Sequence, residues 1–266
     1  STLMRSSAAS DVYKRQILYD GKDLCKLSDK EFKPLRKELQ MVFQNTLSAL
    51  NPRQRIGNIL EDILKIHSNL DAAERREKVV EVLKKVGLSE DHYFRFPHEL
   101  SGGQVQRLGI ASALVIGPKL IVCDEPVSAL DVSIQAQILN MLVQLQKELG
   151  LSLLFISHDI GVIRFISDRI GVMYLGTLVE ETDTEELFAN PLHPYTKGLF
   201  ASVPDPYIER DGFSELSGEQ PVRTEDFKGC AFSTRCPNAT EKCRQEAPVF
   251  REVKAGHKVA CHMVEE

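Results

Sequence analysis

Several features are missing from this 266-residue sequence, and each absence excludes a class of protein. Basic residues are not in excess, because 33 Lys and Arg against 38 Asp and Glu give a net charge of −5, whereas a nucleic-acid surface is normally basic. The longest apolar runs, near residues 120–123 and 151–156, fall far short of the roughly 20 residues of a membrane-spanning helix. The N-terminus has no apolar signal segment. We therefore expect a globular, cytosolic chain.

Cysteine is sparse except near the C-terminus, where it forms a cluster. Cys25 and Cys123 are isolated, and the other four are Cys230, Cys236, Cys243 and Cys261. In a reducing compartment such a cluster indicates a metal before it indicates disulfides. The spacing C-x5-C-x6-C-x17-C differs from the C-x2-C pairs of zinc ribbons. An iron–sulfur cluster, zinc and four unliganded thiols all remain open.

The hydrophobic pattern of the first hundred residues predicts short strands followed by helices. Residues 17–24 are typical of a strand, a turn and a second strand. A capping signal at Ser28 precedes a helix that leads into an apolar strand ending at Gln44. Residues 56–87 have helical periodicity, with Asp71 as an N-cap and Gly87 as a stop.

The middle of the chain alternates strand and helix more clearly. Two continuous apolar strands, in residues 119–126 and 151–159, flank a strongly amphipathic helix that ends at Gly150. This alternation predicts an α/β fold with a doubly wound parallel sheet. Beyond residue 180 prolines punctuate a loop-rich tail that holds the cysteine cluster. We place a domain boundary near residue 185.

The stretch "ELSGGQVQRLGIA" is typical of a helix start that holds phosphate. Ser101, Gly102 and Gly103 stand directly before an amphipathic run. Unpaired amides and the positive end of the helix dipole attract phosphate oxygens, and glycines allow a close backbone approach. The pattern G-x-x-x-x-G-K-[ST], which supplies the phosphate-binding lysine of a P-loop, occurs nowhere in the sequence. The sequence thus contains a helix start suited to phosphate but no P-loop lysine pattern to accompany it.

Polar residues also stand at the ends of the two apolar strands. Asp124 and Glu125 end the first strand, at the sheet edge where ligands of such folds bind. Asp124 can hold Mg²⁺, usually through water, and Glu125 can orient and deprotonate an attacking water. A solvated acidic turn is the alternative. His158 ends the next strand, where it either contacts a γ-phosphate or is an ordinary surface residue.

The order of these features resembles the nucleotide-binding subunit of an ATP-binding cassette (ABC) transporter over roughly residues 17–265. Residues 100–104 match the family signature, and residues 128–131 match the D-loop. The resemblance implies an ABC-type P-loop NTPase sheet in residues 17–185, with a helical subdomain at about residues 45–116, and a Cys-containing region in residues 186–266. It implies ATP and Mg²⁺ as ligands. In such proteins two cassettes pair head to tail, with each ATP between the P-loop of one and the signature of the other.

The resemblance also implies a role for each matching residue. Glu125 and His158 are the expected catalytic residues, as the Walker B glutamate and the switch histidine. The expected nucleotide-contacting residues are Gln44, Ser101, Gly102, Gly103, Gln104, Asp124 and Asp131, together with Ser1 and Thr2. Two departures from the family pattern are Thr46, where proline is common, and Ser112, where arginine is common.

The N-terminus matches the family only in its first three residues. The family P-loop ends Gly-Lys-Ser-Thr-Leu, and this chain begins "STL". Our hypothesis is that the chain is truncated within this motif and that residues 1–16 are a doubtful, scrambled or non-native remnant. The alternative is that "STL" is a coincidence. Without the lysine we expect the chain as given to be deficient in ATP hydrolysis.

The C-terminal region indicates the branch of the family. Residues 190–204 and 229–237 resemble ATPase subunits of bacterial di- and oligopeptide importers, a group that includes nickel importers. This implies a second, different cassette, two membrane permeases and an extracytoplasmic solute-binding protein as partners, and no nucleic acid. It places the chain peripherally on the cytoplasmic face of the bacterial plasma membrane. Similar subunits carry a four-iron four-sulfur cluster on such cysteines. Residues 190–204 could simply be a docking loop.

Two other functions remain as alternatives. A non-transport ABC ATPase of DNA repair or translation would carry coiled-coil, zinc-hook or basic insertions, and the sequence shows none. A non-catalytic iron–sulfur or regulatory module would not need Glu125 and His158. We therefore expect the energy-coupling ATPase of a peptide importer.

Overall fold

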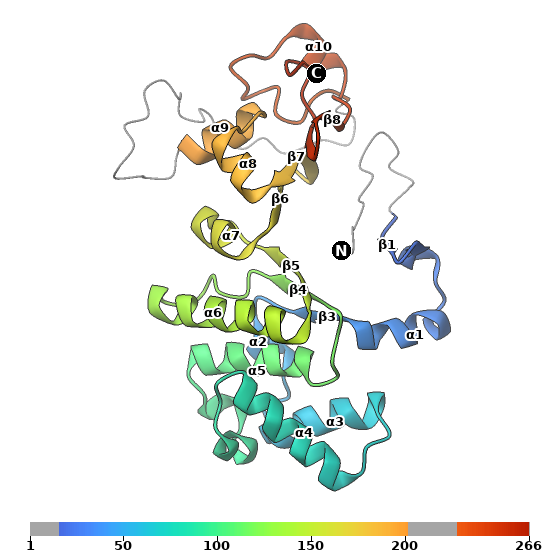
Figure 1. The fold of residues 1–266 in the computed structure, drawn as a ribbon, viewed down its shortest axis with the longest axis vertical. Coiled ribbons are helices and arrows are strands. Elements are labelled where there is room, and N and C mark those ends of the chain that lie inside the picture. The colour runs from blue at the N-terminus through green and yellow to red at the C-terminus, as the bar shows by residue number, and fades with distance from the viewer. Residues whose placement is uncertain (1–15, 202–227, 266) are drawn as a thin grey trace. The chain divides into compact units, whose positions relative to one another are not determined.

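The computed structural model describes residues 16–201 and 228–265 (Figure 1). They form two compact units, the first comprising Tyr19–Ile166 and the second residues 16–18, 167–201 and 228–265. The predictions for residues 1–15, including Ser1 and Thr2, lie outside the described residues, as does the end of the 190–204 segment. Among the described residues, no helix has the length and apolar character needed to cross a membrane.

The first unit is built on a parallel sheet, as the strand–helix alternation predicted. Its strands are β3 (Leu39–Val42), β4 (Leu120–Asp124) and β5 (Ser152–Ile156), in the order β3-β4-β5. β4 pairs in parallel with both neighbours, and Asp124 is in register with Ile156. β3 ends two residues before Gln44, so the predicted strand end at Gln44 is wrong. The chain turns away after Val42, and Gln44 lies in the loop that follows.

Short elements precede β3. They are β1 (Leu18–Tyr19), β2 (Lys22–Asp23), a 3-10 turn (Leu24–Lys26) and α1 (Asp29–Glu38). Asp20 and Gly21 have positive φ in the turn between β1 and β2, which confirms the predicted turn. Ser28 is the N-cap of α1, with a capping box to Glu31, as its position in the sequence predicted.

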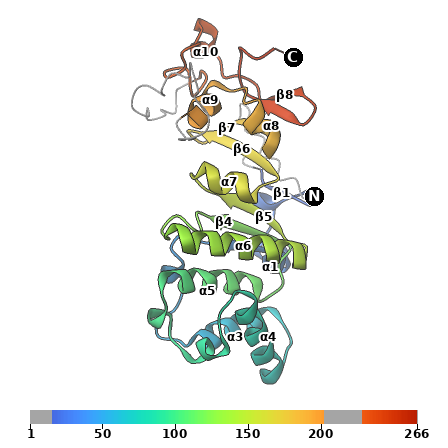
Figure 2. The ribbon, with the colours of Figure 1, turned by 60° about the vertical axis from the view of Figure 1, so that its left-hand side comes forward.

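The helices of the first unit pack on the sheet and on one another. They are α2 (Thr46–Ala49), α3 (Ile56–His67), α4 (Ala72–Lys85), α5 (Gly102–Leu114), α6 (Val132–Leu149) and α7 (Ile160–Ile166), with 3-10 turns at Glu90–Phe94 and Pro97–Glu99. α5 and α6 lie beside the strands, and α3 and α4 pack against α5 on the side away from them (Figures 1 and 2). Leu60, Leu83 and Leu108 are fully buried among these helices.

Caps and glycines determine where these helices begin and end. The helical pattern predicted over residues 56–87 is two helices, because Asp71 starts α4 by accepting hydrogen bonds from the amides of Ala73 and Glu74. Gly87 follows α4 with φ of 74°, and Gly150 follows α6 with φ of 65°. These positions confirm the predicted cap and stops, since glycine adopts positive φ at little steric cost.

α5 and α6 are in close contact near the start of each helix. A Cβ atom added to Gly103 would lie 2.6 Å from Cγ2 of Ile134, in the first turn of α6. A Cβ atom added to Gly102 would come no closer than 3.8 Å to Cδ2 of Leu130. The missing side chain of Gly103 therefore allows packing within the chain, whereas Gly102 leaves room for a ligand.

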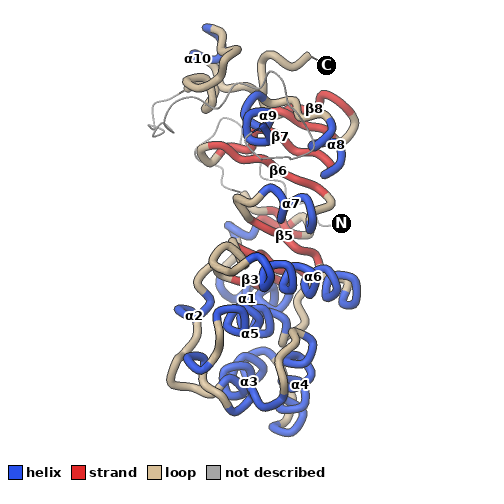
Figure 3. Tube along the Cα trace, turned by 90° about the vertical axis from the view of Figure 1, so that its left-hand side faces the viewer, coloured by secondary structure: helices blue, strands red, loops and turns tan. Residues whose placement is uncertain are grey.

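The second unit contains an antiparallel sheet, which the loop-rich description of the tail did not predict. Its strands, in sheet order, are β6 (Arg169–Tyr174), β7 (Thr177–Asp183), β9 (His257–Val259) and β8 (Arg251–Lys254) (Figure 3). Its helices are α8 (Thr184–Ala189), α9 (Pro194–Ala201) and α10 (Glu241–Gln245). The predicted boundary near residue 185 falls inside α8, and the domain limits stay predictions.

A buried carboxylate organises the second unit. Glu180 of β7 is fully buried, and its oxygens accept hydrogen bonds from the amides of Leu192, at 2.7 Å, and His193, at 3.0 Å. Nε2 of His257 lies 2.8 Å from Oε1 of the same carboxylate. Leaving a buried hydrogen-bonding group without its partner typically costs about 1–3 kcal/mol. The first residues of the 190–204 segment therefore have a structural role, which the sequence alone did not reveal.

Gly103→Ala should destabilise the first unit by overpacking the contact between α5 and α6. Relative to Gly102→Ala, which makes the same chemical change at an open position, we expect a loss of about 1–3 kcal/mol in the free energy of unfolding. Urea titrations of the two variants measure the difference. Adding Ile134→Ala to Gly103→Ala should recover part of the loss. Equal stability of the two alanine variants would contradict the packing role.

His193→Asn should weaken the acid sensitivity of the second unit. Burial lowers the pKa of His193 from 6.5 to about 4, so between these pH values the unfolded chain binds one more proton than the folded chain. The free energy of unfolding therefore falls on acidification through this window, by about 1.4 kcal/mol per pH unit for one proton. Asparagine keeps an acceptor for the Tyr195 amide, which donates to Nδ1 of His193. Denaturant titrations between pH 4.5 and 7 (about half-unit steps) measure the free energy of unfolding, and its plot against pH should be less steep for the variant. Parallel plots for the variant and the wild type would show that His193 does not cause the acid sensitivity.

Candidate functional site

The centre of the site is Glu125, which directly follows β4. Its amide donates a hydrogen bond to the carbonyl of Ile156, at 3.0 Å, so the chain stays paired with β5 one residue beyond the strand. Its φ is +45°, which places a non-glycine residue in the left-handed region. Such backbone costs of order 1–3 kcal/mol and persists only where the surroundings enforce it. The backbone thus fixes the direction in which this side chain leaves the sheet edge.

Two predicted site residues from separate loops meet at the Glu125 carboxylate. Nε2 of Gln44 donates to Oε2 at 2.9 Å, and Nδ1 of His158 lies 3.1 Å from Oε1. For His158 to donate this bond, its proton must be on Nδ1. The Glu125 side chain is 27% exposed and that of His158 73%. The carboxylate is therefore oriented on both oxygens and still accessible to water, which is the arrangement that a general base needs.

Asp124 is the last residue of β4 and lies half-buried beside this cluster. Within residues 16–201 and 228–265, no hydrogen bond to its carboxylate is found, so its oxygens remain available to a cation. Carboxylate oxygens at the carboxyl end of a parallel strand suit Mg²⁺, which binds through one or two carboxylates, waters and phosphate oxygens. The described part of the chain shows no group of three or more His, Cys, Asp or Glu that could hold a metal, and Mg²⁺ held in this way needs none.

The signature residues form the start of α5. Ser101 and Gln104 cap the helix reciprocally: Oγ of Ser101 accepts from the Gln104 amide at 3.4 Å, and Oε1 of Gln104 accepts from the Ser101 amide at 3.0 Å. Nε2 of Gln104 also lies 3.3 Å from Nε2 of His92. Both side chains thus hold the helix start in place, and the amides of Gly102 and Gly103 belong to the first turn, which lacks intrahelical acceptors.

The D-loop residue Asp131 is the N-cap of α6. Its carboxylate accepts hydrogen bonds from the Ile134 amide, at 3.0 Å, and from Oγ of Ser133, at 2.7 Å. These bonds, with the Ile134 amide first, hold the pKa of Asp131 below its usual range. The preceding residue, Leu130, lies against Gly102. The D-loop therefore lies beside the signature.

The predicted residues form two groups that are separate within the chain. Gln44, Glu125 and His158 are joined by hydrogen bonds, and Asp124 is adjacent. Among the described residues no hydrogen bond connects this group with the start of α5 at residues 101–104. Within the chain, hydrogen bonds therefore gather Gln44, Glu125 and His158 in one group, and the start of α5 forms another.

The predicted iron–sulfur or zinc site in the second unit is not supported. All four tail cysteines are free, and no metal-binding group exists among the described residues. The amide of Cys230 donates to the carbonyl of Cys243 at 2.7 Å, so two of these cysteines are neighbours. Burial, with a smaller contribution from nearby cysteines, raises the pKa of the Cys230 and Cys236 thiols.

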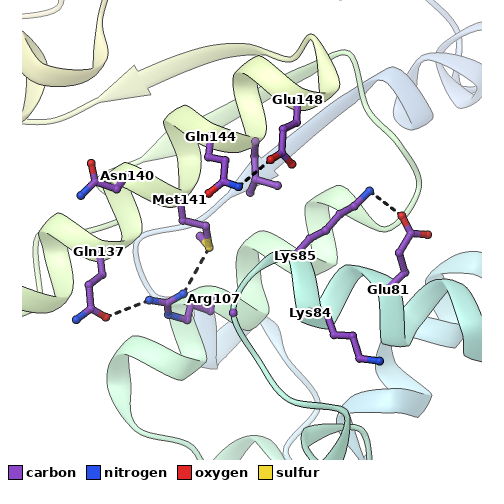
Figure 4. A pocket seen from close by; sticks show the side chains of 11 residues that line it. Glu81, Lys84, Lys85, Arg107, Gln137, Asn140, Met141, Gln144 and Glu148 are labelled. Atoms are coloured by element: carbon purple, nitrogen blue, oxygen red, sulfur yellow. Dashed lines mark hydrogen bonds and ion pairs between the residues drawn. The ribbon is translucent and has the colours of Figure 1, made fainter.

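Two features of the first unit were missed in the sequence. Gln106 is a buried polar residue of α5 that contacts Thr46; the only signal was a glutamine on the apolar face of a helix. A cavity of about 780 Å³ lies between α4, α5 and α6, with Lys84, Lys85 and Arg107 in its lining (Figure 4). Arg107 there donates to the Val86 carbonyl at 2.8 Å.

The chain is similar to known proteins in both of its parts. Residues 1–128 match the profile of the family described as "ABC transporter", and residues 179–243 match "Oligopeptide/dipeptide transporter, C-terminal region". The oligopeptide transport ATP-binding protein AppF of Bacillus subtilis is 49% identical over 93% of this chain and 77% of that protein. OppF of Haemophilus influenzae, of the same description, is 51% identical over 92% of this chain and 75% of that protein.

A solved structure agrees with the fold of the first unit. The ATP-binding cassette MJ0796, described as dimeric in a post-hydrolysis state with ADP and Pi, superposes with a TM-score of 0.57 at 31% identity. The match covers 64% of this chain and 73% of that chain. The relatives named above do not favour the alternative of DNA repair or translation. By its sequence and its fold, the chain belongs to the ATP-binding subunits of oligopeptide and dipeptide ABC transporters.

Proposed function

We propose that this chain drives peptide import as one of two cassettes that pair head to tail and hydrolyse ATP at their interface. The observation that supports this most directly is the orientation of the Glu125 carboxylate by Gln44 and His158 at the sheet edge. In this proposal Gln44, Glu125 and His158 carry out hydrolysis, and the start of α5 binds the nucleotide held by the partner cassette.

In the hydrolytic group, Glu125 acts as the general base. It accepts a proton from the attacking water while the water oxygen bonds to the γ-phosphorus, and the bond to the ADP oxygen breaks. Gln44 fixes one carboxylate oxygen, and His158 fixes the other. Because His158 is largely exposed, its ring can also contact the γ-phosphate and respond to its loss.

Asp124 is the residue that would hold Mg²⁺. The ion, when bound, neutralises charge on the phosphate oxygens. Asp124 supplies a carboxylate with no hydrogen-bond partner among the described residues, one residue before the general base.

The start of α5 serves the nucleotide of the partner cassette. Gly102 is exposed, and a side chain there would still have space, so a phosphate can approach the amides of the first turn. The helix dipole favours an anion at this end. Since the hydrogen bonds of the described residues leave this helix start apart from Glu125, a second cassette completes each site. The related cassette MJ0796 is described as dimeric, which supports this reading.

The remaining subunits are inferred from the transport function for which the relatives are named. We infer two membrane permeases, a second cassette of a different kind and an extracytoplasmic solute-binding protein as partners. The chain would then lie on the cytoplasmic face of the bacterial plasma membrane.

Gly102→Asp should abolish nucleotide-dependent pairing, because its carboxylate would stand where the proposal puts a phosphate. The 266-residue chain, mixed with a cassette that carries an intact P-loop, should form a complex only with Mg-ATP. Light scattering or sedimentation measures this complex. Asn140→Asp, which adds the same charge at an exposed position of α6, is the control and should pair normally. Equal pairing by both variants would contradict the proposal that a phosphate binds at Gly102.

Glu125→Gln should block hydrolysis and leave nucleotide binding intact. The sequence contains no P-loop lysine pattern, so we expect the 266-residue chain alone to hydrolyse almost no ATP. With a P-loop segment supplied upstream, the chain should bind and hydrolyse ATP, and Glu125→Gln should lower kcat by about 10²-fold or more. Glu148→Gln, a change at an exposed carboxylate, should have no effect. Turnover of about 1–10² per second by the chain alone would contradict the expected deficiency.

A further inference from the structure

A buried hydrogen bond connects the loop that contains Gln44 with the signature helix. Oγ1 of Thr46, the first residue of α2, lies 2.9 Å from Oε1 of Gln106 in α5, and both residues are 6% exposed. Oγ1 of Thr46 also donates to the carbonyl of Phe43 at 3.2 Å. Phe43 directly precedes Gln44, which binds Glu125.

The hydrogen count shows how these three groups are connected. The Thr46 hydroxyl carries one hydrogen, which only one of the two oxygens can accept. Nε2 of Gln106 is buried without a partner among the described residues. If the Gln106 amide is turned so that its NH₂ group donates to Oγ1, the hydroxyl can donate to the Phe43 carbonyl. The result is a continuous chain from the Gln106 amide through the Thr46 hydroxyl to the Phe43 carbonyl.

The shape of α5 holds Thr46 in one position. A Cβ atom added to Gly109 would lie 2.5 Å from Cγ2 and 2.8 Å from Oγ1 of Thr46. Gly109 and Gln106 are three residues apart and so lie on the same face of the helix. Thr46 therefore packs against α5 in the space left by Gly109 and beside the Gln106 amide, and it has little room to move.

The loop of residues 43–46 is consequently held at both ends. At one end Thr46 is bound to α5, whose first residues are the signature. At the other end Nε2 of Gln44 is bound to Glu125. A shift of α5 is thus transmitted through three residues of backbone to the side chain that orients the general base.

We propose that Thr46 is a positioning residue that couples the signature helix to Gln44 and, through it, to Glu125. The inference rests on the proposed function, which assigns Gln44 and Glu125 to hydrolysis. In the general pattern that the chain resembles, proline is common at this place and would offer no hydroxyl.

Three variants separate positioning from packing. Thr46→Val keeps the shape and removes the hydroxyl, Thr46→Ser keeps the hydroxyl, and Thr46→Val/Gln106→Leu removes both polar partners. In Thr46→Val, Gln106 is left buried and unpartnered, so we expect Tm to fall by about 3 °C. In the double variant the Gln106 amide is no longer stranded and only the Phe43 carbonyl loses a donor, so Tm should largely recover.

The activity readout is ATP hydrolysis by the complete transporter with its own membrane and partner subunits, in which this chain carries the P-loop segment supplied upstream. For Thr46→Val we expect kcat to fall at least about fivefold and KM for ATP to stay within about twofold. Thr46→Ser should retain the wild-type kcat. The double variant should regain Tm but not kcat, because the link to Gln44 is still missing.

Amide hydrogen exchange gives a readout that does not depend on ATP hydrolysis. Exchange of residues 43–49 should be faster in Thr46→Val and in the double variant than in Thr46→Ser or the wild type. If the wild type with the supplied P-loop segment hydrolysed no ATP, the proposed function would fail, and the exchange rates would still decide on the coupling. If the wild type is active, unchanged kcat in Thr46→Val, recovery of kcat with Tm in the double variant, or unchanged exchange would each overturn the inference.

Discussion

The orientation of the Glu125 carboxylate is the constraint on which the remainder of the site depends. Its backbone has a positive φ, its amide remains bonded to β5, and its two oxygens are engaged by residues from the loops after β3 and β5. Each of the three parallel strands therefore contributes to one side chain. Because neighbouring parallel strands end at the same edge, the sheet converts residues that are 81 and 33 positions away in sequence into direct neighbours.

The signature helix has two functions that a sequence motif cannot distinguish. Ser101 and Gln104 satisfy each other as a cap, and Gly103 makes room for Ile134. Gly102 is the residue of the motif whose small size is not required by a close neighbour in the chain. Capping and packing within the chain therefore explain the residue types at positions 101, 103 and 104, which the sequence motif alone would assign to phosphate binding. The same helix also reaches the loop of Gln44 through Gln106, so its position bears on both halves of the proposed chemistry.

Sequence reasoning succeeded where the deciding interactions are local. The cap at Asp71 and the stop at Gly150 depend on a few adjacent residues, and the structure confirms them. The strand predicted to end in Asp124 and Glu125 is also present, and it ends at Asp124. The end of β3 was placed two residues too late, since pairing with β4 decides it. The sheet of the second unit was missed because β8 and β9 are short and charged, and β7, with which β9 pairs, is distant in sequence. The Thr46–Gln106 bond was also missed, because its two residues are distant from each other in the sequence.

The Glu180–His257 pair has a consequence for dividing the protein into separately expressed pieces. The carboxylate comes from residue 180, its two amide donors from residues 192 and 193, and its imidazole partner from residue 257. A fragment that stops shortly before residue 257 would keep the acid in an apolar interior and discard the ring that matches it. His257, Val259, Ala260 and Cys261 are buried, so this part of the C-terminal segment belongs to the interior of the second unit.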